Sequence, residues 1–390
     1  MQDRLNILFL SSWYPCRNNP YNGNFVARHA VAVAKFANVY VLHACSEEDI
    51  TTTEIIVSEN RGVQTIQIYY PKIKNSIPII GQIQKYFVLR RLYLDAFLDL
   101  RKKIGLINLI HTNIIFPIGS IANYLHKKFS IPFVITEHWT GYLPVNSEKL
   151  SLIDLKLSRK IVSKASFILP VSNDLRNSMQ KLGIKGNYKV VPNVVDTDLF
   201  SLKEPAHSPF RFIHVSTLND NHKNISGILR TIKALSCKRT DFYFLIVGDG
   251  DTQPHTKYAE QLDIPKDIIQ IEGARPIDEI ATYMRQSDAF ILFSNYENLP
   301  CVISEALCIG LPVISSDVGG VNEMIDDSNG VLIVSKDEKT LCNKMSYMID
   351  NYIKYDTLNI RKNAIEKYSY DKVGQQFINI YKDVLTPKQI

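Results

Sequence analysis

Short runs of Val, Ile, Leu and aromatic residues alternate with longer segments of helical periodicity along the whole chain. We expect strands at residues 6–11, 38–44, 63–70, 109–114, 132–138 and 167–172 in the first half, and at 211–216, 242–248, 268–273, 289–294, 312–317 and 330–334 in the second. Runs so rich in large apolar residues imply strands buried on both faces. The pattern therefore predicts parallel α/β architecture, with helices covering the sheets.

The pattern changes near the middle of the chain. A length of 390 residues exceeds one ordinary core and suits two domains. The segment 190–210, "VVPNVVDTDLFSLKEPAHSPF", contains three prolines and mostly polar residues after Phe200. We expect the crossing between domains here, with a first domain of residues 1–200 and a second of residues 201–368.

Composition narrows the class of protein. Hydrophobic content of 45% and charged content of 22% are typical of a soluble globular protein. The opening residues lack the features of a signal peptide, and polar residues and a proline interrupt the most apolar later run, residues 106–125. We therefore expect no bilayer-spanning helix. The six cysteines form no CxxC pair and have no histidine at the spacing of a zinc motif, which favours reduced thiols, a cytoplasmic location and no metal site.

Charge is unevenly distributed. The net charge is +6, but residues 1–200 hold 24 Lys/Arg against 14 Asp/Glu, whereas the remainder is mildly acidic. A basic first half suggests an anionic partner. Residues 72–103 carry eight Lys/Arg interleaved with Tyr86, Phe87, Leu92, Tyr93 and Phe97. This segment is either a basic amphipathic helix that contacts an anionic membrane peripherally or a packed helix with a solvated basic face. Nucleic acid is a weaker rival, because no groove-reading motif is present.

Polar residues that follow the expected strands are candidates for chemistry, since doubly wound sheets bind ligands at the carboxyl ends of their strands. In "NYENLPCVISEA", Glu297 lies in a loop, Pro300 suits the first turn of a helix, and Glu305 lies inside that helix. The helix N-terminus suits a diphosphate, and a nearby carboxylate can accept hydrogen bonds from a ribose diol. Two carboxylates also suggest a glycoside hydrolase, and each alone is more simply a surface residue.

Several motifs in order resemble one known family. The stretch "SNYENLPCVISEALCIGLPVISSDVGGVNEMI" resembles the most characteristic segment of retaining glycosyltransferase family 4, and "VVPNVVDTDLF", "LIVGDGD", "SSWYPCRNNPYNGNF" and "SYDKVGQQFINIYKDVL" resemble other family segments. The resemblance covers nearly the whole chain. It implies the GT-B fold of two facing Rossmann-like, doubly wound domains with a cleft between them. The first would bind the acceptor, the second the nucleotide-sugar donor, and a helix in residues 369–390 would cross back to the first.

The resemblance also implies roles in the second domain. Glu305 matches the glutamate that holds the nucleotide ribose, Glu297 the one near the donor sugar, and Lys223 the lysine on the donor phosphates. The residues Asn298, Leu299 and Pro300 complete the donor loop. Many relatives have an arginine where this chain has Thr217, so one expected cation is missing. Arg275 could compensate, or it could be a solvated loop residue.

In the first domain, Gly23 matches a small residue whose backbone approaches the donor phosphates, although "NG" is also a strong turn dipeptide. His138, at the end of an expected strand, matches the family histidine that reaches the transferred sugar. His111 and Ser172 also follow strands and are further cleft candidates. Asn193 and Asp196 are expected to fix the geometry of the linker.

Two apparent metal motifs are discounted. "DTD" at Asp196–Asp198 and "DGD" at Asp249–Asp251 have no supporting His or carboxylate nearby in sequence, and both coincide with ordinary turns of the family. We expect no metal and no cofactor beyond the donor itself. The expected function is transfer of a sugar from a UDP- or GDP-sugar to a glycan or lipid-linked acceptor in surface polysaccharide assembly. The rivals are a GT-B epimerase and a catalytically silent scaffold, the latter favoured by Thr217.

Overall fold

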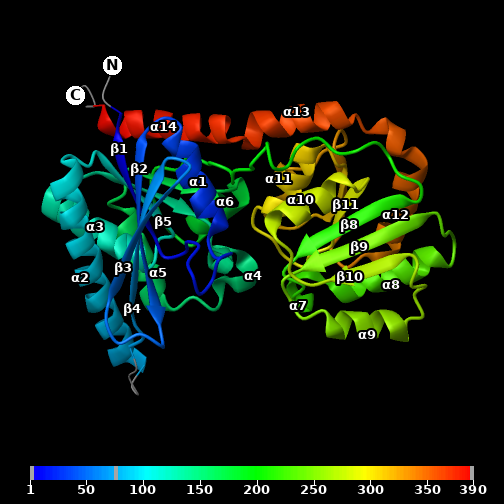
Figure 1. Cartoon of the computed structure of the whole chain (residues 1–390), viewed down its shortest axis with the longest axis horizontal. Coiled ribbons are helices and arrows are strands. Elements are labelled where there is room, and N and C mark those ends of the chain that lie inside the picture. Colours follow the sequence, from blue (N-terminus) through cyan, green and yellow to red (C-terminus); the bar gives the residue numbers. More distant parts are fainter. Residues whose placement is uncertain (1–3, 74–77, 387–390) are drawn as a thin grey trace. The chain divides into compact units, whose positions relative to one another are not determined.

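The chain forms two compact units in a computed structural model that describes residues 4–73 and 78–386 (Figure 1). Unit 1 combines the chain up to Val194 with the segment from Tyr370 onward, and unit 2 is Val195–Ser369. The boundary between the units in the sequence follows Val194, six residues before the predicted boundary at residue 200. Each contains one sheet with strands buried in a doubly wound arrangement, so the predicted pair of α/β domains is confirmed.

The sheet of unit 1 has seven strands in the order β3-β4-β2-β1-β5-β6-β7. Its strands are β1 (Asn6–Ser11), β2 (Asn38–Glu47), β3 (Glu54–Asn60), β4 (Val63–Pro71), β5 (Leu109–Asn113), β6 (Phe133–Glu137) and β7 (Phe167–Pro170). All neighbouring pairs are parallel except β3 and β4. Chain order reverses between β1 and β5, so the loops after these two strands start from the same edge of the sheet.

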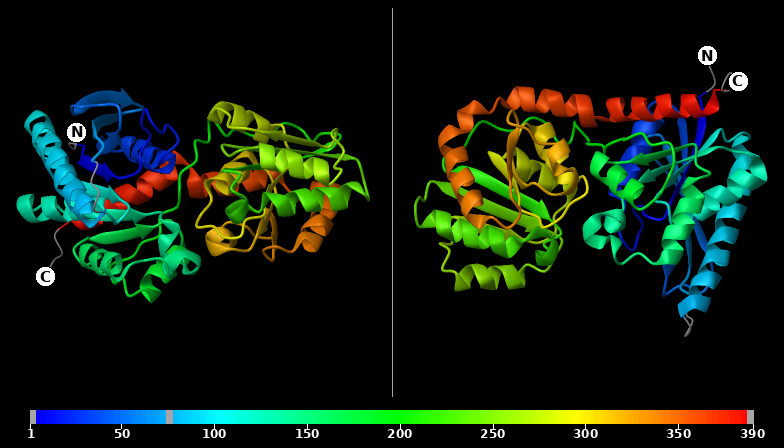
Figure 2. Two further views of the ribbon diagram at one scale, coloured as in Figure 1. Left: turned by 90° about the horizontal axis from the view of Figure 1, so that it is seen from below. Right: turned by 180° about the vertical axis from the view of Figure 1, so that it is seen from behind.

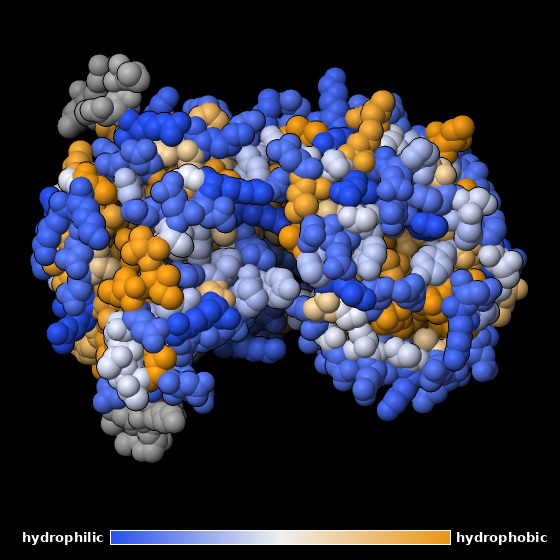
Figure 3. All heavy atoms as spheres, in the orientation of Figure 1, coloured by the Kyte–Doolittle hydropathy of each residue, from blue (hydrophilic) through white to orange (hydrophobic). Residues whose placement is uncertain are grey.

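Strand β3 was not predicted, and the expectation of a wholly parallel sheet is wrong at this edge. The strand pairs antiparallel to β4 through a two-residue turn in which Arg61 and Gly62 both have positive φ, the geometry of a tight hairpin. Its apolar residues Ile55, Ile56 and Val57 are consecutive and exposed. They therefore lack both the alternation and the burial that identify a strand in sequence. Apolar surface is visible in Figure 3 over the part of unit 1 where β3 and β4 lie.

The helices of unit 1 follow its strands, and the last helix of the chain returns to it. They are α1 (Asn24–Ala34), α2 (Pro78–Ile104), α3 (Ile118–Phe129), α4 (Pro144–Ser147), α5 (Leu152–Val162), α6 (Asn173–Lys181) and α14 (Tyr370–Leu385), with a 3-10 turn η1 (Thr140–Tyr142). Helix α14 packs along α1, as the red and blue segments in Figure 2 show. Gly374 makes this approach possible, because a Cβ there would lie 2.3 Å from the carbonyl oxygen of Ala32.

Helix α2 contains residues 78–103 of the basic segment singled out in the sequence, whereas Lys72 precedes the helix and Lys74 lies outside the described residues. Two of its expected membrane-facing aromatics are core residues instead. Tyr93 is 1% exposed and donates a hydrogen bond to the carbonyl oxygen of Ser11, and Phe97 is fully buried. Exposed apolar side chains remain in the first turns, including Phe87, which is 57% exposed. No helix within the described residues combines the length and apolarity needed to cross a bilayer.

Unit 2 is built around six strands in the order β10-β9-β8-β11-β12-β13, all parallel. The strands are β8 (Phe210–Ser216), β9 (Phe242–Gly248), β10 (Ile269–Glu272), β11 (Ala289–Leu292), β12 (Val313–Ser316) and β13 (Gly330–Ile333). The helices are α7 (Asp220–Lys223), α8 (Ile225–Ser236), α9 (Gln253–Gln261), α10 (Ile277–Arg285), α11 (Cys301–Ile309), α12 (Glu338–Asn351) and α13 (Thr357–Tyr368), with 3-10 turns η2 (Gly319–Glu323) and η3 (Tyr352–Lys354). Helix α8 contacts α9 and α12, and α11 contacts α10 and α13. Chain order reverses between β8 and β11.

Candidate functional site

The clearest polar cluster of unit 2 lies at its topological switch point. Strands β8 and β11 are neighbours in the sheet. In the chain, 72 residues, which include β9 and β10, lie between the end of β8 at Ser216 and the start of β11 at Ala289. The loops that follow them, residues 217–224 and 293–300, therefore leave the same carboxyl edge side by side. This is the position at which open α/β sheets bind their ligands.

The backbone of the first loop fixes the place of Lys223. After β8 the chain takes positive φ at Leu218, and the side chain of Asn219 then accepts a hydrogen bond from the N–H of His222 to start the single turn α7. Asn224 ends that turn in the left-handed region, with φ of 53° and ψ of 47°. Lys223, the last residue of α7, is held with its side chain only 10% exposed.

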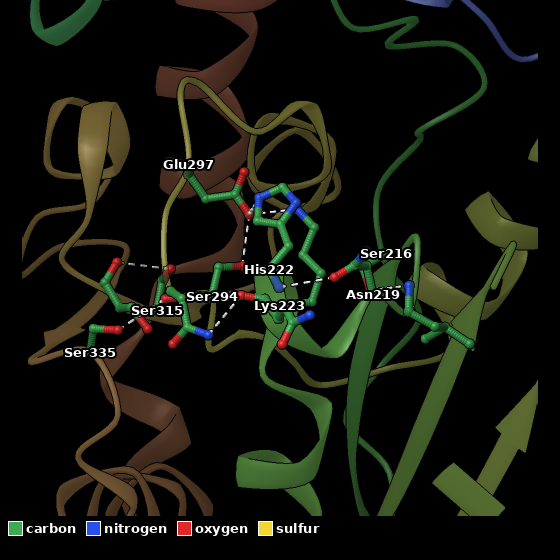
Figure 4. A network of polar contacts seen from close by, with 12 residues as sticks. Ser216, Asn219, His222, Lys223, Ser294, Glu297, Ser315 and Ser335 are labelled. Atoms are coloured by element: carbon green, nitrogen blue, oxygen red, sulfur yellow. Dashed lines mark hydrogen bonds and ion pairs between the residues drawn. The ribbon is translucent and has the colours of Figure 1, made fainter. Parts of the chain in front are cut away.

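The Lys223 side chain meets Glu297 from the second loop. Its Nζ lies 2.5 Å from Oε1 of Glu297, the same oxygen that accepts a hydrogen bond from Ser294 Oγ at 2.7 Å. His222 Nε2 lies 3.7 Å from that oxygen. Figure 4 shows Ser294, His222 and Lys223 all directed toward Glu297. The sequence indicated Lys223 and Glu297 separately but not their contact, and it missed Ser294 and His222, whose only signals are adjacency to the predicted residues.

Electrostatics keep Glu297 ionised. Burial alone would raise its pKa, but the positive charge of Lys223 and the neighbouring His222 outweigh burial and lower the pKa from 4.5 to about 2. At neutral pH the residue is therefore a carboxylate. A group in this state can hold a cation or accept hydrogen bonds from sugar hydroxyls, but it has no proton to donate as a general acid.

The loop that carries Glu297 is tied on both sides. The ring of Tyr296 stacks on His222 with centroids 4.1 Å apart and planes 7° apart. On the other side, the N–H of Gly320 donates to the carbonyl oxygen of Asn298 at 2.9 Å. Gly319 has φ of 57°, and a Cβ there would lie 2.0 Å from the carbonyl oxygen of Glu297. Gly319 of η2 is therefore required for the loop to lie as it does.

Helix α11 starts at Cys301, the first residue of the predicted helical segment, and only the place of Pro300 differs. Pro300 has extended ψ and is the N-cap rather than a first-turn residue, so the helix starts at Cys301. Leu299 and Pro300 are buried, and they lead the chain into the N-terminus of the helix. Glu305 lies on α11 and is 4% exposed, which excludes an ordinary solvated surface position. The structure thus brings the predicted loop and helix residues together at one edge of the sheet.

Neither Thr217 nor Arg275 supplies a cation in place of the arginine that many relatives carry. Thr217 is exposed directly after β8, and its carbonyl oxygen packs so closely on Gly250 that a Cβ there would lie 2.5 Å away. Arg275 follows the edge strand β10, and its Nε donates to Glu272 at 2.8 Å. The structure therefore does not bring Arg275 together with Lys223, and the proposed compensation is not supported.

Unit 1 brings the neighbours of Gly23 against His138. Gly23 caps α1 with φ of 68°, and its missing Cβ makes room for the backbone of Trp13, whose carbonyl oxygen would be 2.3 Å from that atom. This glycine is thus already required by the fold. The ring of Phe25 lies 4.4 Å from the ring of His138, and His29 lies 5.4 Å from it. Burial holds the pKa of His138 well below its usual value, so its ring is neutral.

Glu137, which the sequence did not single out, fixes the backbone around His138. Its side chain is fully buried and accepts hydrogen bonds from three backbone N–H groups, those of Ile115, His138 and Trp139, at 2.8–2.9 Å. Burial raises its pKa from 4.5 to about 7, although these donors favour the charged form. A Glu at a strand end next to a candidate histidine was the available signal.

The remaining cleft candidates of unit 1 have structural roles. His111 lies inside β5 and uses both ring nitrogens, one toward the hydroxyl of Tyr381 at 2.5 Å and one toward that of Thr136 at 2.6 Å. Ser172 caps α6 by accepting from the N–H of Leu175. The hypothesis that His111 and Ser172 line a cleft is therefore not supported by their contacts.

Residues of the interdomain segment and of the two Asp motifs form turns. Asn193 is buried at the end of unit 1, and Asp196 accepts from the N–H of Leu199 at 3.2 Å. Asp251 accepts from the N–H of Gln253 at the start of α9. Within the described residues, neither motif belongs to a group of three or more potential metal ligands.

Family models match both units. The model described as Glycosyltransferase Family 4 matches residues 57–199, and the model described as glycosyl transferases group 1 matches residues 209–351. The first match ends five residues beyond the boundary between the units, the second lies wholly in unit 2, and together they cover most of the chain.

Individual proteins agree with these models. TuaC of Bacillus subtilis, whose name assigns it provisionally to teichuronic acid biosynthesis as a glycosyltransferase, is 22% identical over 96% of this chain and 95% of its own. The UDP-Gal:alpha-D-GlcNAc-diphosphoundecaprenol alpha-1,3-galactosyltransferase of Escherichia coli is 29% identical over 38% of each chain. Anabaena HepE, solved in complex with UDP, superposes with a TM-score of 0.70 over 97% of this chain and all of its own, at 17% identity. The chain therefore belongs to the family 4 and group 1 glycosyltransferases and has their GT-B fold.

Proposed function

We propose that the chain transfers a sugar from a UDP-sugar to a glycan or lipid-linked acceptor, with retention of configuration and without a metal ion. The observation that carries this proposal is the buried ion pair of Lys223 and Glu297 at the switch point of the unit 2 sheet. A lysine ammonium at this edge, close to the start of α11, suits the diphosphate of a donor. Glu305 on α11 would then hold the ribose diol of the nucleotide.

In this mechanism the chain's own charges replace a metal. As the bond between the sugar and the diphosphate lengthens, negative charge develops on the diphosphate, and Lys223 stabilises it. Glu297, ionised at neutral pH, orients the ammonium and accepts hydrogen bonds from the sugar. The acceptor hydroxyl attacks on the face from which the diphosphate leaves, with a donor phosphate oxygen receiving its proton. His138, neutral and packed against Phe25, is the unit 1 side chain proposed to contact the sugar.

The rival reactions fit this geometry less well. A glycoside hydrolase needs one protonated carboxylic acid near its reacting bond, whereas the charge of Lys223 helps to lower the pKa of Glu297 to about 2 and leaves it deprotonated. An epimerase would also need acid/base residues in contact with the sugar. A catalytically silent scaffold would not need Lys223, a buried cation that Glu297 holds at the proposed phosphate position. In favour of the scaffold, Thr217 in place of arginine leaves the proposed phosphate site with one cation fewer.

The acceptor is proposed from the relatives and from the surface of α2. The galactosyltransferase relative is named for a UDP-Gal donor and a GlcNAc-diphosphoundecaprenol acceptor, and TuaC is named for teichuronic acid biosynthesis. We therefore place this chain in surface polysaccharide assembly at the cytoplasmic face of the membrane. The first turns of α2 expose Ile83, Phe87 and Val88 close to Lys85 and Arg91, which suits peripheral contact with anionic lipid.

The transfer reaction tests the proposal. The purified chain is incubated with a panel of UDP-sugars and simple glycan or lipid-diphosphate acceptors, without added Mg²⁺ or Mn²⁺, and UDP release and product are followed by chromatography and proton NMR. We expect acceptor-dependent UDP release and a product with the anomeric configuration of the donor. An inverted anomer would contradict retention, and turnover only after addition of a divalent cation would contradict metal independence. Donor conversion without acceptor would favour the epimerase.

A further inference from the structure

Three side chains of the metal-ligating kind meet in unit 1, although they come from two segments of the chain. The Sγ atoms of Cys16 and Cys45 and an imidazole nitrogen of His43 all lie within 4.8 Å of one another, and the two Sγ atoms are 3.3 Å apart. His43 and Cys45 are two residues apart on β2, so their side chains leave the same face of the strand. Cys16 lies in the loop after β1, where its N–H and carbonyl both bond to Asn19.

The orientation of His43 prepares one ring nitrogen as a ligand. Its Nδ1 lies 3.0 Å from the backbone carbonyl oxygen of Ser11, which can only accept, so Nδ1 carries the hydrogen. Nε2 of the neutral ring then has a free lone pair, and this atom is buried without a hydrogen-bond partner. The His43 side chain is 2% exposed, so water does not readily satisfy Nε2. Histidines that bind metals commonly donate their other N–H to a backbone carbonyl in this way.

We propose that Cys16, His43 and Cys45 form a binding site for a thiophilic metal ion, with Zn²⁺ as the ion that fits it. Two thiolates and one imidazole are ligands that zinc prefers, and they leave a fourth tetrahedral position open. Metal bonds of about 2.3 Å to sulfur and about 2.0 Å to nitrogen place such ligands roughly 3.5–3.8 Å apart, so small side-chain shifts complete the site. Binding releases the two thiol protons and transfers no electrons. The ligand set does not suit Mg²⁺ or Ca²⁺, which require oxygen.

The ion would join two parts of unit 1 that secondary structure alone leaves separate. Residues 12–23 form the loop that connects β1 to α1, and β2 lies next to β1 in the sheet. A metal bond from Cys16 to His43 and Cys45 would fix the middle of this loop to β2. The same loop contains Trp13, whose backbone fits against Gly23. The site is thus a structural clamp on the loop and takes no part in the donor chemistry proposed for unit 2.

Metal titration of the full-length chain tests the site. The reduced, metal-free protein is titrated with Co²⁺ and then with Zn²⁺. We expect thiolate-to-cobalt charge-transfer absorption that saturates at one ion per chain and disappears when Zn²⁺ displaces the cobalt. At a hundredfold excess over its Kd, Zn²⁺ is expected to raise the melting temperature by roughly 5–10 °C, measured by tryptophan fluorescence.

Two serine variants separate this site from adventitious binding. Cys45→Ser is expected to abolish the charge-transfer absorption and the Zn²⁺-dependent rise in melting temperature. Cys237→Ser, which changes an exposed cysteine of unit 2, should retain both. If Cys45→Ser does not fold, alkylation of the wild-type chain decides the question, because Zn²⁺ should protect Cys16 and Cys45 but not Cys237.

Two results would overturn the proposal. One is alkylation of Cys16 and Cys45 at the same rate with and without saturating Zn²⁺, or cobalt absorption that persists in Cys45→Ser. The other is a disulfide between Cys16 and Cys45 that forms when the reduced protein is exposed to dissolved oxygen as the oxidant despite saturating Zn²⁺, which would assign these thiols to a redox pair instead.

Discussion

Replacing Lys223 by methionine is expected to reduce sugar transfer from a UDP-sugar by roughly 10²–10³-fold, the loss typical of removing one preorganised charge at a transition state. The side chain is buried and its ammonium lies 2.5 Å from Glu297, and Arg275, which bonds to Glu272, does not take its place. Methionine keeps the length and packing of the lysine stem while removing the charge. Initial rates of UDP release with acceptor present measure the effect.

The same substitution should also destabilise unit 2. Glu297 would remain buried without its cation, and breaking a buried pair by removing one partner costs about 3–5 kcal/mol. The pKa of Glu297, lowered from 4.5 to about 2 in the folded chain, points to the same size of effect, about 3 kcal/mol. Because the folded pKa is depressed, this stabilisation is present above pH 4.5 and is lost as the pH falls toward 2. Hydrogen exchange in β8 and β11 reports it locally.

A double variant separates stability from catalysis. Lys223→Met with Glu297→Gln removes both charges of this buried pair, and Ser294 can still donate to the amide oxygen, so stability should return while transfer stays low. Lys257→Met, an exposed lysine on α9, is the matched control and should change neither. Recovery of transfer in the double variant would contradict a role for the Lys223 charge in the reaction and would reduce the pair to a structural one.

Glu137→Gln is expected to remove a pH dependence of about 3 kcal/mol from the free energy of unfolding of unit 1. Burial raises the pKa of Glu137 from 4.5 to about 7, so the folded chain holds a proton that the unfolded chain has lost between these values. Stability from this group is therefore fully present below pH 4.5 and falls as the pH rises to 7. The stability of Glu137→Gln relative to wild type should rise by about this amount over the same range.

The free energy of unfolding of Glu137→Gln is compared with that of the wild type at each pH, because buried histidines change stability with pH in the opposite direction to Glu137. Burial lowers the pKa of His29 to about 4 and holds those of His111 and His138 well below 6.5. These rings resist protonation in the folded chain, so they reduce stability as the pH falls below 6.5. The difference between variant and wild type cancels this contribution. Urea unfolding followed by tryptophan fluorescence reports unit 1 alone, because Trp13 and Trp139 both lie in it.

Glu137→Gln also lowers the stability of unit 1 by an amount that does not depend on pH. One of the terminal atoms of the glutamine side chain is an N–H donor, so one of the three backbone N–H groups bound by Glu137 loses its acceptor, at about 1–3 kcal/mol. Glu148→Gln, at an exposed position of the same unit, should show neither effect. A difference between Glu137→Gln and wild type that does not vary from pH 4.5 to 7.5 would show that Glu137 is ionised throughout and would contradict the elevated pKa.

The buried strands were predictable because each is a compact apolar run with a single interpretation. Strand β9 is found at the predicted residues, 242–248. Strand β3 was missed for the opposite reason, since Ile55, Ile56 and Val57 face solvent and only the tight turn at Arg61 and Gly62 places them in the sheet. For helix α2 the sequence left membrane contact and packing as alternatives, and the structure buries both Tyr93 and Phe97. Charge pattern alone does not distinguish the buried face of such a helix from an exposed one.

For the candidate site, the sequence likewise indicated single residues but not the contacts between them. Lys223, Glu297 and Glu305 were indicated by their places in segments that resemble glycosyltransferase family 4. Their contacts were not, since the 74 residues between Lys223 and Glu297 are bridged only by the order of strands in the sheet. The cluster of Cys16 with His43 and Cys45 was missed for the same reason. Spacing along the chain suggested isolated thiols, and the neighbouring positions of β1 and β2 bring them together.

The most direct test of the donor site is calorimetric titration with UDP and with GDP, in buffer free of divalent cations, on the wild type, Glu305→Ala and the exposed control Glu260→Ala. The account predicts one UDP bound per chain with micromolar affinity, weaker binding of GDP, and a loss of roughly 10–100-fold in Glu305→Ala, the range expected for a hydrogen bond to a charged group. Equal affinity of Glu305→Ala and wild type for UDP, or no metal-free binding of either nucleotide, would contradict it.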